Sequence, residues 1–326
     1  MRRTLSTRTA TVAAVRPVAA DIVQIDLAPG DGDTAFESGA HLDVEVVIDG
    51  RRETRSYSLI PAPVGLLRLA VKREPSSRGG SAAMHRLAAG ARVAFSGPTN
   101  DFPAVFDGRE KLLVAGGIGI TPMISHARAC AARGEPFRLV YVGRSRAAMA
   151  YADDLAAEFG ERLELRISDE GTRFDCAAEI ARLGPDGGLW FCGPHRLLDD
   201  LRHAWKDAGR SWLDFRFENF GGNDGEAAAS FVVAVPRHGV EITVPPDRSM
   251  LEAMEAAGLD LMSFCLRGEC GLCALPVTAV EGGRIVHRDV FFSDAEKAEG
   301  THVCPCVSRL DGGRITVDTN FRPDAI

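Results

Sequence analysis

The sequence has no apolar run long enough to cross a membrane and no excess of basic residues. A spanning helix needs roughly 20 consecutive apolar residues, and no stretch of the 326 residues approaches that length. Met1 to Leu5 include two arginines, but no apolar segment of signal-peptide length follows, so we expect a cytoplasmic protein without a membrane anchor. The formal net charge of −7 argues against nucleic-acid binding, because phosphate contacts require a basic surface.

Internal repeats and low-complexity tracts are also missing. The chain is 45% hydrophobic and 25% charged, which is typical of globular proteins, and it is long enough for two or three domains. Residues 9–106 contain short alternating runs, such as Asp43 to Ile48, between turn residues, which predicts a small antiparallel barrel. Residues 109–220 alternate apolar strands with helical segments, which predicts a parallel sheet.

A glycine-rich run with little to bury follows at residues 221–229, and we interpret residues 223–230 as a linker. Beyond it, Phe231 to Val235 and Glu241 to Val244 predict a hairpin, and Ser249 to Ala257 predict a helix. The predicted domains are therefore residues 1–107, 108–222 and 231–326.

Five of the eight cysteines lie in the last quarter of the chain, which indicates a metal site rather than a disulfide framework. Cys265, Cys270 and Cys273 have the spacing of a plant-type [2Fe-2S] site, and Cys304 or Cys306 can supply the fourth thiolate. Zinc is the main alternative, but structural zinc usually takes two Cys-x2-Cys pairs. Gly268 and Gly271 would let the loop turn its N–H groups toward sulfur.

A second motif, Gly116-Gly117-Ile118-Gly119-Ile120-Thr121-Pro122, follows a predicted strand and precedes a predicted helix. Such glycines let a dinucleotide lie against the backbone at a helix N-terminus. We expect Thr121 to cap that helix and Pro122 to fit its first turn. The motif lacks the third glycine of Gly-x-Gly-x-x-Gly, so a merely tight strand-to-helix connection is the alternative.

A nicotinamide site and an iron-sulfur site in one chain require a carrier between them. Hydride carries two electrons and the cluster accepts one at a time, and a flavin can exchange electrons in both ways. The candidates in the first domain are the runs Arg55 to Ser58 and Arg78 to Ser81, the second of which precedes a short predicted helix at Ala82 to Leu87. The alternative for both is an ordinary strand and an ordinary loop.

These motifs, in this order, resemble the phthalate dioxygenase reductases and vanillate demethylase reductases. The resemblance extends to Cys192-Gly193-Pro194, His287-Arg288-Asp289 and Cys306-Val307-Ser308-Arg309, and it covers nearly the whole chain. It implies a ferredoxin-reductase-like antiparallel flavin barrel, a parallel α/β nucleotide-binding domain and a C-terminal β-grasp ferredoxin. It also implies FMN, NADH and a [2Fe-2S] cluster as cofactors and a Rieske-type terminal oxygenase as partner.

The resemblance also implies roles for individual residues. Near the reacting part of the flavin it places Ser58, Cys192 and Phe220, the last as the aromatic that covers the flavin. The flavin would be held by Arg55, Ser56, Tyr57, Ser58, Val71, Lys72, Arg78, Gly79, Gly80 and Ser81. The nucleotide would be held by Gly116, Gly117, Gly119, Thr121, Cys192, Gly193 and Pro194, and the cluster by Cys265, Cys270, Cys273 and Cys306.

Three questions stay open at this point. Arg144 and Arg146 follow a predicted strand without an adjacent acid, and arginine there can accept the 2′-phosphate of NADPH, although the resemblance favours NADH. The acceptor could be a cytochrome P450 instead of a Rieske oxygenase, or the chain could be a redox sensor. Residues 231–326 contain 14 acidic and 9 basic residues, a net charge of −5, which predicts an acidic face toward the acceptor.

Overall fold

The computed structural model describes residues 6–48, 50–74, 79–220 and 229–319. Its contacts divide the chain into two compact units, one within Leu5–Gly222 and the other formed mainly by Asn223–Ile326. Arg78 and most of the predicted linker lie outside the described residues. In the part of the chain that is described, no helix combines the length and the apolar character needed to cross a membrane.

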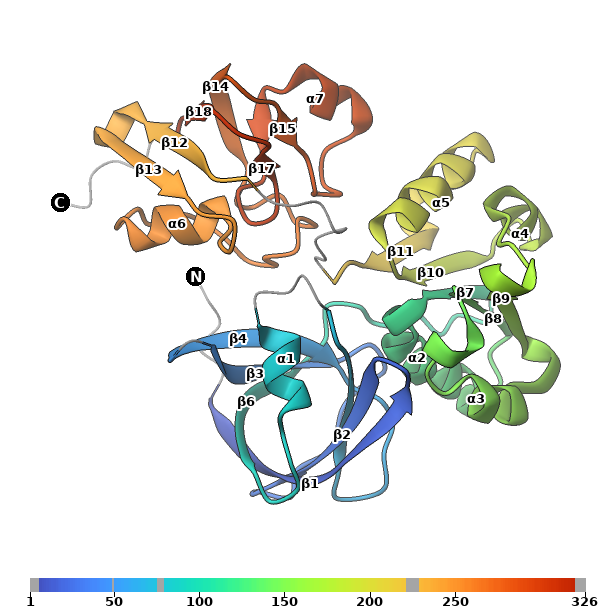
Figure 1. The fold of residues 1–326 in the computed structure, drawn as a ribbon. Helices are drawn as coiled ribbons and strands as arrows, with labels where there is room; N and C mark the ends of the chain where they lie inside the picture. Colours follow the sequence, from blue (N-terminus) through green and yellow to red (C-terminus); the bar gives the residue numbers. More distant parts are fainter. Residues whose placement is uncertain (1–5, 49, 75–78, 221–228, 320–326) are drawn as a thin grey trace. The chain divides into compact units, whose positions relative to one another are not determined.

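The first half of the larger unit is an antiparallel sheet with the strand order β4-β3-β6-β1-β2-β5, which curves into a barrel (Figure 1). Its alternate side chains, including Val12, Leu27, Leu42 and Phe95, fill a common core. The short helix α1 is tied to β5 by a 2.8 Å hydrogen bond between His85 Nε2 and the Val71 carbonyl. The elements are β1 (Arg8–Ala19), β2 (Ile22–Pro29), β3 (His41–Ile48), β4 (Arg51–Ser58), β5 (Leu67–Lys72), α1 (Gly80–His85) and β6 (Arg92–Thr99).

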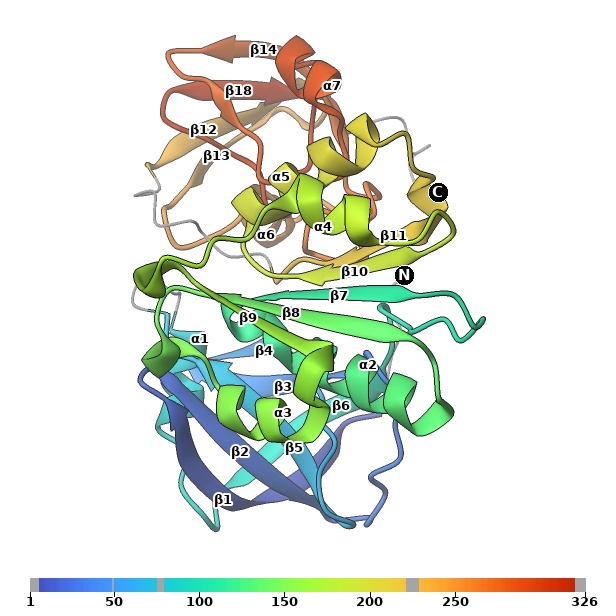
Figure 2. The same ribbon diagram turned by 90° about the vertical axis from the view of Figure 1, so that its right-hand side faces the viewer.

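The second half of this unit is a parallel sheet with the order β11-β10-β7-β8-β9. Figure 2 shows α2 and α3 on one face of the sheet and α4 and α5 on the other. All residues of β7 and β10 are buried, as their largely apolar sequences predict, and the buried Lys111 at the start of β7 pairs with Asp107 and Glu135. The elements are β7 (Lys111–Gly116), α2 (Ile120–Arg133), β8 (Phe137–Gly143), α3 (Ala152–Phe159), β9 (Leu163–Ile167), α4 (Cys176–Arg182), β10 (Gly188–Cys192), α5 (His195–Asp207) and β11 (Phe215–Glu218).

The smaller unit has a mixed sheet with the order β13-β12-β18-β14-β16 and a separate β15-β17 pair. Helix α6 begins with a complete capping box, in which Ser249 and Glu252 bond each other's backbone N–H groups. The elements are β12 (Phe231–Val235), β13 (Val240–Val244), α6 (Met250–Ala256), β14 (Leu275–Glu281), β15 (Ile285–Val286), α7 (Asp294–Glu299), β16 (His302–Val303), β17 (Arg309–Leu310) and β18 (Arg314–Val317).

One local prediction was wrong. Thr121 does not cap α2, because the helix begins at Ile120 with Gly119 at the N-cap position and no side chain caps it. The Thr121 hydroxyl instead donates to the Ile118 carbonyl at 3.1 Å, inside the 3-10 turn Gly117–Gly119 that leads into the helix. The helix therefore starts two residues earlier than a cap at Thr121 would place it, and Pro122 still falls in its first turn.

Candidate functional site

The carboxyl ends of β7, β10 and β11 meet at one edge of the parallel sheet. Cys192 pairs with Ala115 on one side and with Glu218 on the other. From β7 the chain continues to β8 and β9 on one side, and then crosses back to β10 and β11 on the other side. Ligands of such sheets bind where the strand order reverses, so the glycine-rich turn and the Cys192 segment flank the expected nucleotide site.

The glycine-rich turn and the Cys192 segment touch backbone to backbone. A Cβ atom on Gly119 would lie 2.1 Å from the Cys192 carbonyl oxygen, and one on Gly116 would lie 2.5 Å from Cδ of Pro194. A Cβ on Gly193 would lie 2.9 Å from Cα of Gly116. Side chains at these three positions would force the two segments apart, so the structure brings together the predicted nucleotide-binding runs.

The sequence analysis did not single out Glu218, which lies at this edge of the parallel sheet. Its carboxylate belongs to the last residue of β11 and is almost fully buried, beside the end of β10 and two positions before Phe220. Phe220, the aromatic predicted to cover the flavin, is 40% exposed. An acid within the run Phe217 to Phe220 is the sequence signal that could have marked this position.

The two arginines after β8 are not free cations. Arg144 Nε lies 3.9 Å from Asp169 Oδ1, and Arg146 pairs with Asp153 at 3.0 Å and with Glu170 at 3.8 Å. Asp169 also donates its backbone N–H to the Arg144 carbonyl. The acids come from α3 and from the 3-10 turn Ser168–Glu170 after β9, so the five groups together carry a net charge of −1.

The predicted flavin residues gather where β4 meets the start of α1. A Cβ on Gly80 would lie 2.7 Å from Arg55 Nε, so the Arg55 side chain lies directly against this glycine. Burial raises the pKa of Tyr57 to about 12, so its phenol stays protonated. Ser58 is buried, and its Oγ has no hydrogen-bond partner among the described residues. A buried hydroxyl without a partner fits a ligand with polar ring atoms.

Three other predicted residues have polar partners within the chain. Ser56 lies on the opposite face of β4 from Arg55 and Tyr57, where its hydroxyl donates to Asp43 at 2.5 Å. Its place follows from strand alternation, which turns neighbouring side chains to opposite faces. Lys72 pairs with Glu74 at 2.9 Å, and the Ser81 hydroxyl accepts the Glu74 N–H at 3.1 Å. Ser56 is therefore separated from Arg55 and Tyr57, on the face of β4 that alternation also gives to Ser58.

The cysteine loop is shaped to hold thiolates. The Cys265 sulfur accepts the backbone N–H groups of Arg267, Glu269 and Cys270, each at 3.4 Å. Gly268 and Gly271 both have left-handed φ angles, and a Cβ on Gly271 would lie 2.3 Å from the Phe291 ring. In the described chain, no group of three or more His, Cys, Asp or Glu residues is placed to hold a single metal ion. A two-iron cluster spreads its four thiolates over two irons.

Both candidates for the fourth thiolate lie beside Cys273. The Cys306 and Cys273 sulfurs are 3.2 Å apart, while Cys304 is fully buried in a cluster with Cys273 and Phe292. Hydrogen bonds from the Cys304 and Cys306 thiols lower the pKa of Cys273 below its usual value. The two residues do not lie on one strand, because the Cys304 carbonyl accepts the Val307 and Ser308 N–H groups in a turn.

The His287-Arg288-Asp289 run braces this turn. Asp289 is fully buried and accepts hydrogen bonds from Ser308 Oγ at 2.9 Å, Phe292 N at 3.0 Å and His287 Nδ1 at 3.3 Å. Burial alone would raise the pKa of Asp289, but these hydrogen bonds lower it below its usual value. The carboxylate thus links its own run, residues 287–292, to the turn that follows Cys306.

Arg309, three residues after Cys306, links more distant segments. Its guanidinium donates to the carbonyls of Ala229 at 3.2 Å, Pro245 at 2.9 Å and Arg248, and it lies over the Phe231 ring at 5.0 Å. The segment that carries the last cysteine is therefore fixed to the start of the smaller unit.

Comparison with known proteins gives the class of the molecule. The oxidoreductase FAD-binding domain model matches residues 11–103, and the 2Fe-2S iron-sulfur cluster binding domain model matches residues 233–311. With the geometry above, these matches define a flavin- and iron-sulfur-containing oxidoreductase.

The chain belongs to the family of phthalate dioxygenase reductase. It is 34% identical over 319 residues to phthalate dioxygenase reductase of Burkholderia cepacia, covering 94% of this chain and 96% of that protein. A solved structure of phthalate dioxygenase reductase matches with a TM-score of 0.76 and 31% identity, covering 96% of this chain and 98% of that one.

Two further relatives broaden the family. Phenoxybenzoate dioxygenase subunit beta of Ectopseudomonas oleovorans is 37% identical over 305 residues, covering 91% of this chain and 93% of that protein. An intact type IV self-sufficient cytochrome P450 monooxygenase is 34% identical with a TM-score of 0.66, covering 95% of this chain but 41% of that one. The predicted fold class is confirmed.

Proposed function

We propose that this chain is the NADH-dependent reductase component of a two-component Rieske-type oxygenase or demethylase. One observation carries the proposal. The sheet edge with the glycine-rich turn, the predicted flavin residues and a plant-type cluster loop occur in one chain. A bound flavin accepts a hydride's two electrons together and releases them singly, which the cluster requires. The names of the reductase relatives support an oxygenase as the acceptor.

The chain's own residues would bind and orient the reactants. We propose that Arg55, Tyr57 and Ser58, with Lys72 and Gly79 to Ser81, hold FMN. Gly116 to Thr121 and Cys192 to Pro194 would hold the pyrophosphate and nicotinamide, and Phe220 would cover the ring system until nicotinamide enters. The matching model is named for FAD, so acid release of the flavin and chromatography test the choice, and FAD would overturn it.

The preference for NADH follows from the acids beside Arg144 and Arg146. A 2′-phosphate adds about two negative charges, and the patch already carries a net charge of −1. Wild-type protein should therefore have a higher kcat/KM with NADH than with NADPH. Asp169→Asn combined with Glu170→Gln should raise kcat/KM for NADPH about tenfold and leave that for NADH within about twofold. A wild-type preference for NADPH would refute the proposal.

The fourth cluster ligand is proposed to be Cys306. Cys306→Ala should abolish the cluster spectrum and cytochrome c reduction, yet NADH should still reduce the flavin and ferricyanide. Cys304→Ala is the matched control, because its thiol also lies against Cys273 but should leave the cluster spectrum in place. The opposite pair of results would assign Cys304 instead.

The acceptor should meet the smaller unit around its cysteine loop. Several exposed side chains there are apolar, namely Met262, Phe264, Leu266, Leu272 and Phe291. Apolar surface of this kind is suited to a protein partner, and the net charge of −5 would steer a basic one. Slower electron transfer to the cognate oxygenase at high salt tests the electrostatic part. The cytochrome P450 alternative is favoured by the P450 relative and is tested by offering both acceptors.

A further inference from the structure

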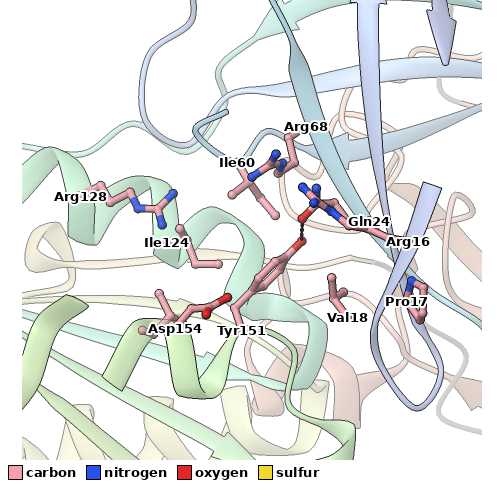
Figure 3. Close-up of a pocket in the computed structure, with 11 residues that line it drawn as sticks. Arg16, Pro17, Val18, Gln24, Ile60, Arg68, Ile124, Arg128, Tyr151 and Asp154 are labelled. Atoms are coloured by element: carbon pink, nitrogen blue, oxygen red, sulfur yellow. Dashed lines mark hydrogen bonds between the residues drawn. The ribbon is translucent and has the colours of Figure 1, made fainter. Parts of the chain in front are cut away.

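A pocket of about 420 Å³ lies between the barrel and the parallel sheet, inside the larger unit (Figure 3). The barrel lines it with Arg16, Gln24 and Arg68, and the nucleotide half lines it with Ile124, Arg128 and Tyr151. One hydrogen bond crosses it, from the Tyr151 hydroxyl to Gln24 Oε1 at 3.1 Å. This bond joins side chains of the two halves that carry the proposed flavin and nucleotide residues.

Tyr151 has an unusual backbone conformation. It is the N-cap residue of α3, with φ 62° and ψ 9°, in the left-handed region that non-glycine residues avoid. N-cap residues are ordinarily extended, and the Tyr151 side chain caps nothing. Strain of this kind persists where the surroundings fix it and is often connected with function. Here the residue directs its side chain away from its own helix and onto the barrel.

The donor and the acceptor of the hydrogen bond between Tyr151 and Gln24 follow from the other contacts of Gln24. Gln24 is buried, and its Nε2 lies 3.0 Å from both carboxylate oxygens of Asp26. Asp26 also accepts Arg68 Nε at 2.7 Å and Nη2 at 3.0 Å, and Arg16 Nη2 at 3.3 Å. An ionised carboxylate can only accept, so Gln24 must turn its NH2 group to Asp26 and its carbonyl to Tyr151. The hydroxyl of Tyr151 is therefore the donor.

Apolar contacts already hold the two halves together. One core joins Ile22, Ile60 and Phe102 of the first half to Leu113, Ile120 and Ile124 of the second. Other hydrogen bonds across the junction use backbone carbonyls, as from Ala20 N to Ala147 O at 2.9 Å. Apolar burial is not directional, whereas the buried chain from Tyr151 through Gln24 to Asp26 permits one arrangement of its groups.

We propose that Tyr151 is a positioning residue, which through Gln24 sets the orientation of the nucleotide half relative to the flavin barrel. This inference rests on the proposed hydride transfer from NADH. That step requires the reacting atoms to approach to about 3–3.5 Å, and small misplacements are costly. Tyr151 itself contacts neither ligand in this assignment. Its loss should therefore slow hydride transfer more than it weakens NADH binding.

The test uses the full-length holoprotein and the variant Tyr151→Phe, which keeps the ring and removes the hydroxyl. Stopped-flow reduction of the flavin by NADH should be about tenfold slower, with the NADH dissociation constant changed by less than about twofold. The long-wavelength charge-transfer absorbance of the nicotinamide–flavin complex should weaken. Gln24→Leu removes the same bond from the barrel side, and the double variant should be no slower than either single variant.

Arg182→Gln is the matched control. Arg182 is the last residue of α4 and donates to Glu164 at 2.9 Å, a polar contact within the nucleotide half. It should keep the wild-type reduction rate and charge-transfer absorbance. If Tyr151→Phe or Gln24→Leu retains flavin and matches the wild-type rate and absorbance, the inference is overturned. It is also overturned if Arg182→Gln is slowed equally. Failure of NADH to reduce the wild-type flavin would instead refute the proposed function.

Discussion

The two glycine-rich runs of the larger unit look alike in sequence but are packed differently. Both precede a helix, α2 in the nucleotide half and α1 in the barrel. At Gly119 the space for a side chain is taken by the Cys192 backbone, whose carbonyl oxygen would lie 2.1 Å from a Cβ atom. At Gly80 it is taken by the Arg55 side chain, at 2.7 Å.

The difference lies in what can move. Backbone at the end of a central strand is held by its neighbours, whereas an arginine side chain can rotate away. Gly119 is therefore required for the backbone packing of the glycine-rich turn against the Cys192 segment. Gly80 is required for the observed position of the Arg55 side chain. Three substitutions test this contrast.

Gly119→Ala should have the largest effect. The new methyl group would push the start of α2 from the end of β10, and overpacking of this kind costs about 1–3 kcal/mol or more. We expect KM for NADH to rise at least about tenfold, which corresponds to about 1.4 kcal/mol. Flavin and cluster absorbance should persist, because neither site includes this turn. Steady-state kinetics and visible spectra measure both, and an unchanged KM would contradict the packing argument.

Gly80→Ala should have an intermediate effect of a different kind. The methyl group displaces Arg55, which would cost flavin binding about 1 kcal/mol, roughly a fivefold rise in the dissociation constant. The melting temperature of the flavin-free protein should change little. Fluorescence titration of flavin-free protein with FMN checks the first expectation. Arg55→Ala is the control, and once Arg55 is gone, adding Gly80→Ala should cause little further loss.

Gly117→Ala should have the smallest effect. This glycine has φ 55° with no atom within 4 Å of a Cβ position, so the substitution adds backbone strain without a clash. An alanine in this conformation costs about 1–2 kcal/mol. We expect a fall in melting temperature of about 2–4 °C for each 1 kcal/mol, and KM for NADH within about threefold of wild type. A rise in KM as large as that of Gly119→Ala would contradict this contrast. It would show that both glycines are needed for nucleotide binding and not for packing of the turn.

Much of the architecture could be predicted from local sequence. The strand Phe231–Val235 was predicted with its observed limits, and the cysteine spacing predicted the loop in which Cys265 accepts three N–H groups. These features depend on residues close together in the chain. A glycine-rich turn after a buried strand has few alternatives, and so has a Cys-x4-Cys-x2-Cys loop.

Features that depend on distant residues could not be predicted. Arg144 and Arg146 have no acid in their own run, and their partners Asp169 and Glu170 come from the end of the neighbouring strand. The bond between Tyr151 and Gln24 spans 127 positions, and nothing in either local sequence indicates it. Ser56 was included with Arg55 and Tyr57 because they are adjacent, although strand alternation already separates it from them.

The hydrogen bonds of Arg309 couple local opening of the Cys306 segment to unfolding of the rest of the smaller unit. Its guanidinium is bonded to carbonyls of Ala229, Pro245 and Arg248, while its own segment begins three residues earlier with Cys306. Releasing that cysteine by a local opening would leave a buried cation without acceptors, which is costly. Fraying of the last-cysteine turn is therefore coupled to the loss of the first strand and of α6. Hydrogen exchange in these three segments should be a single cooperative event, so the unit would lose its cysteine site and its fold together.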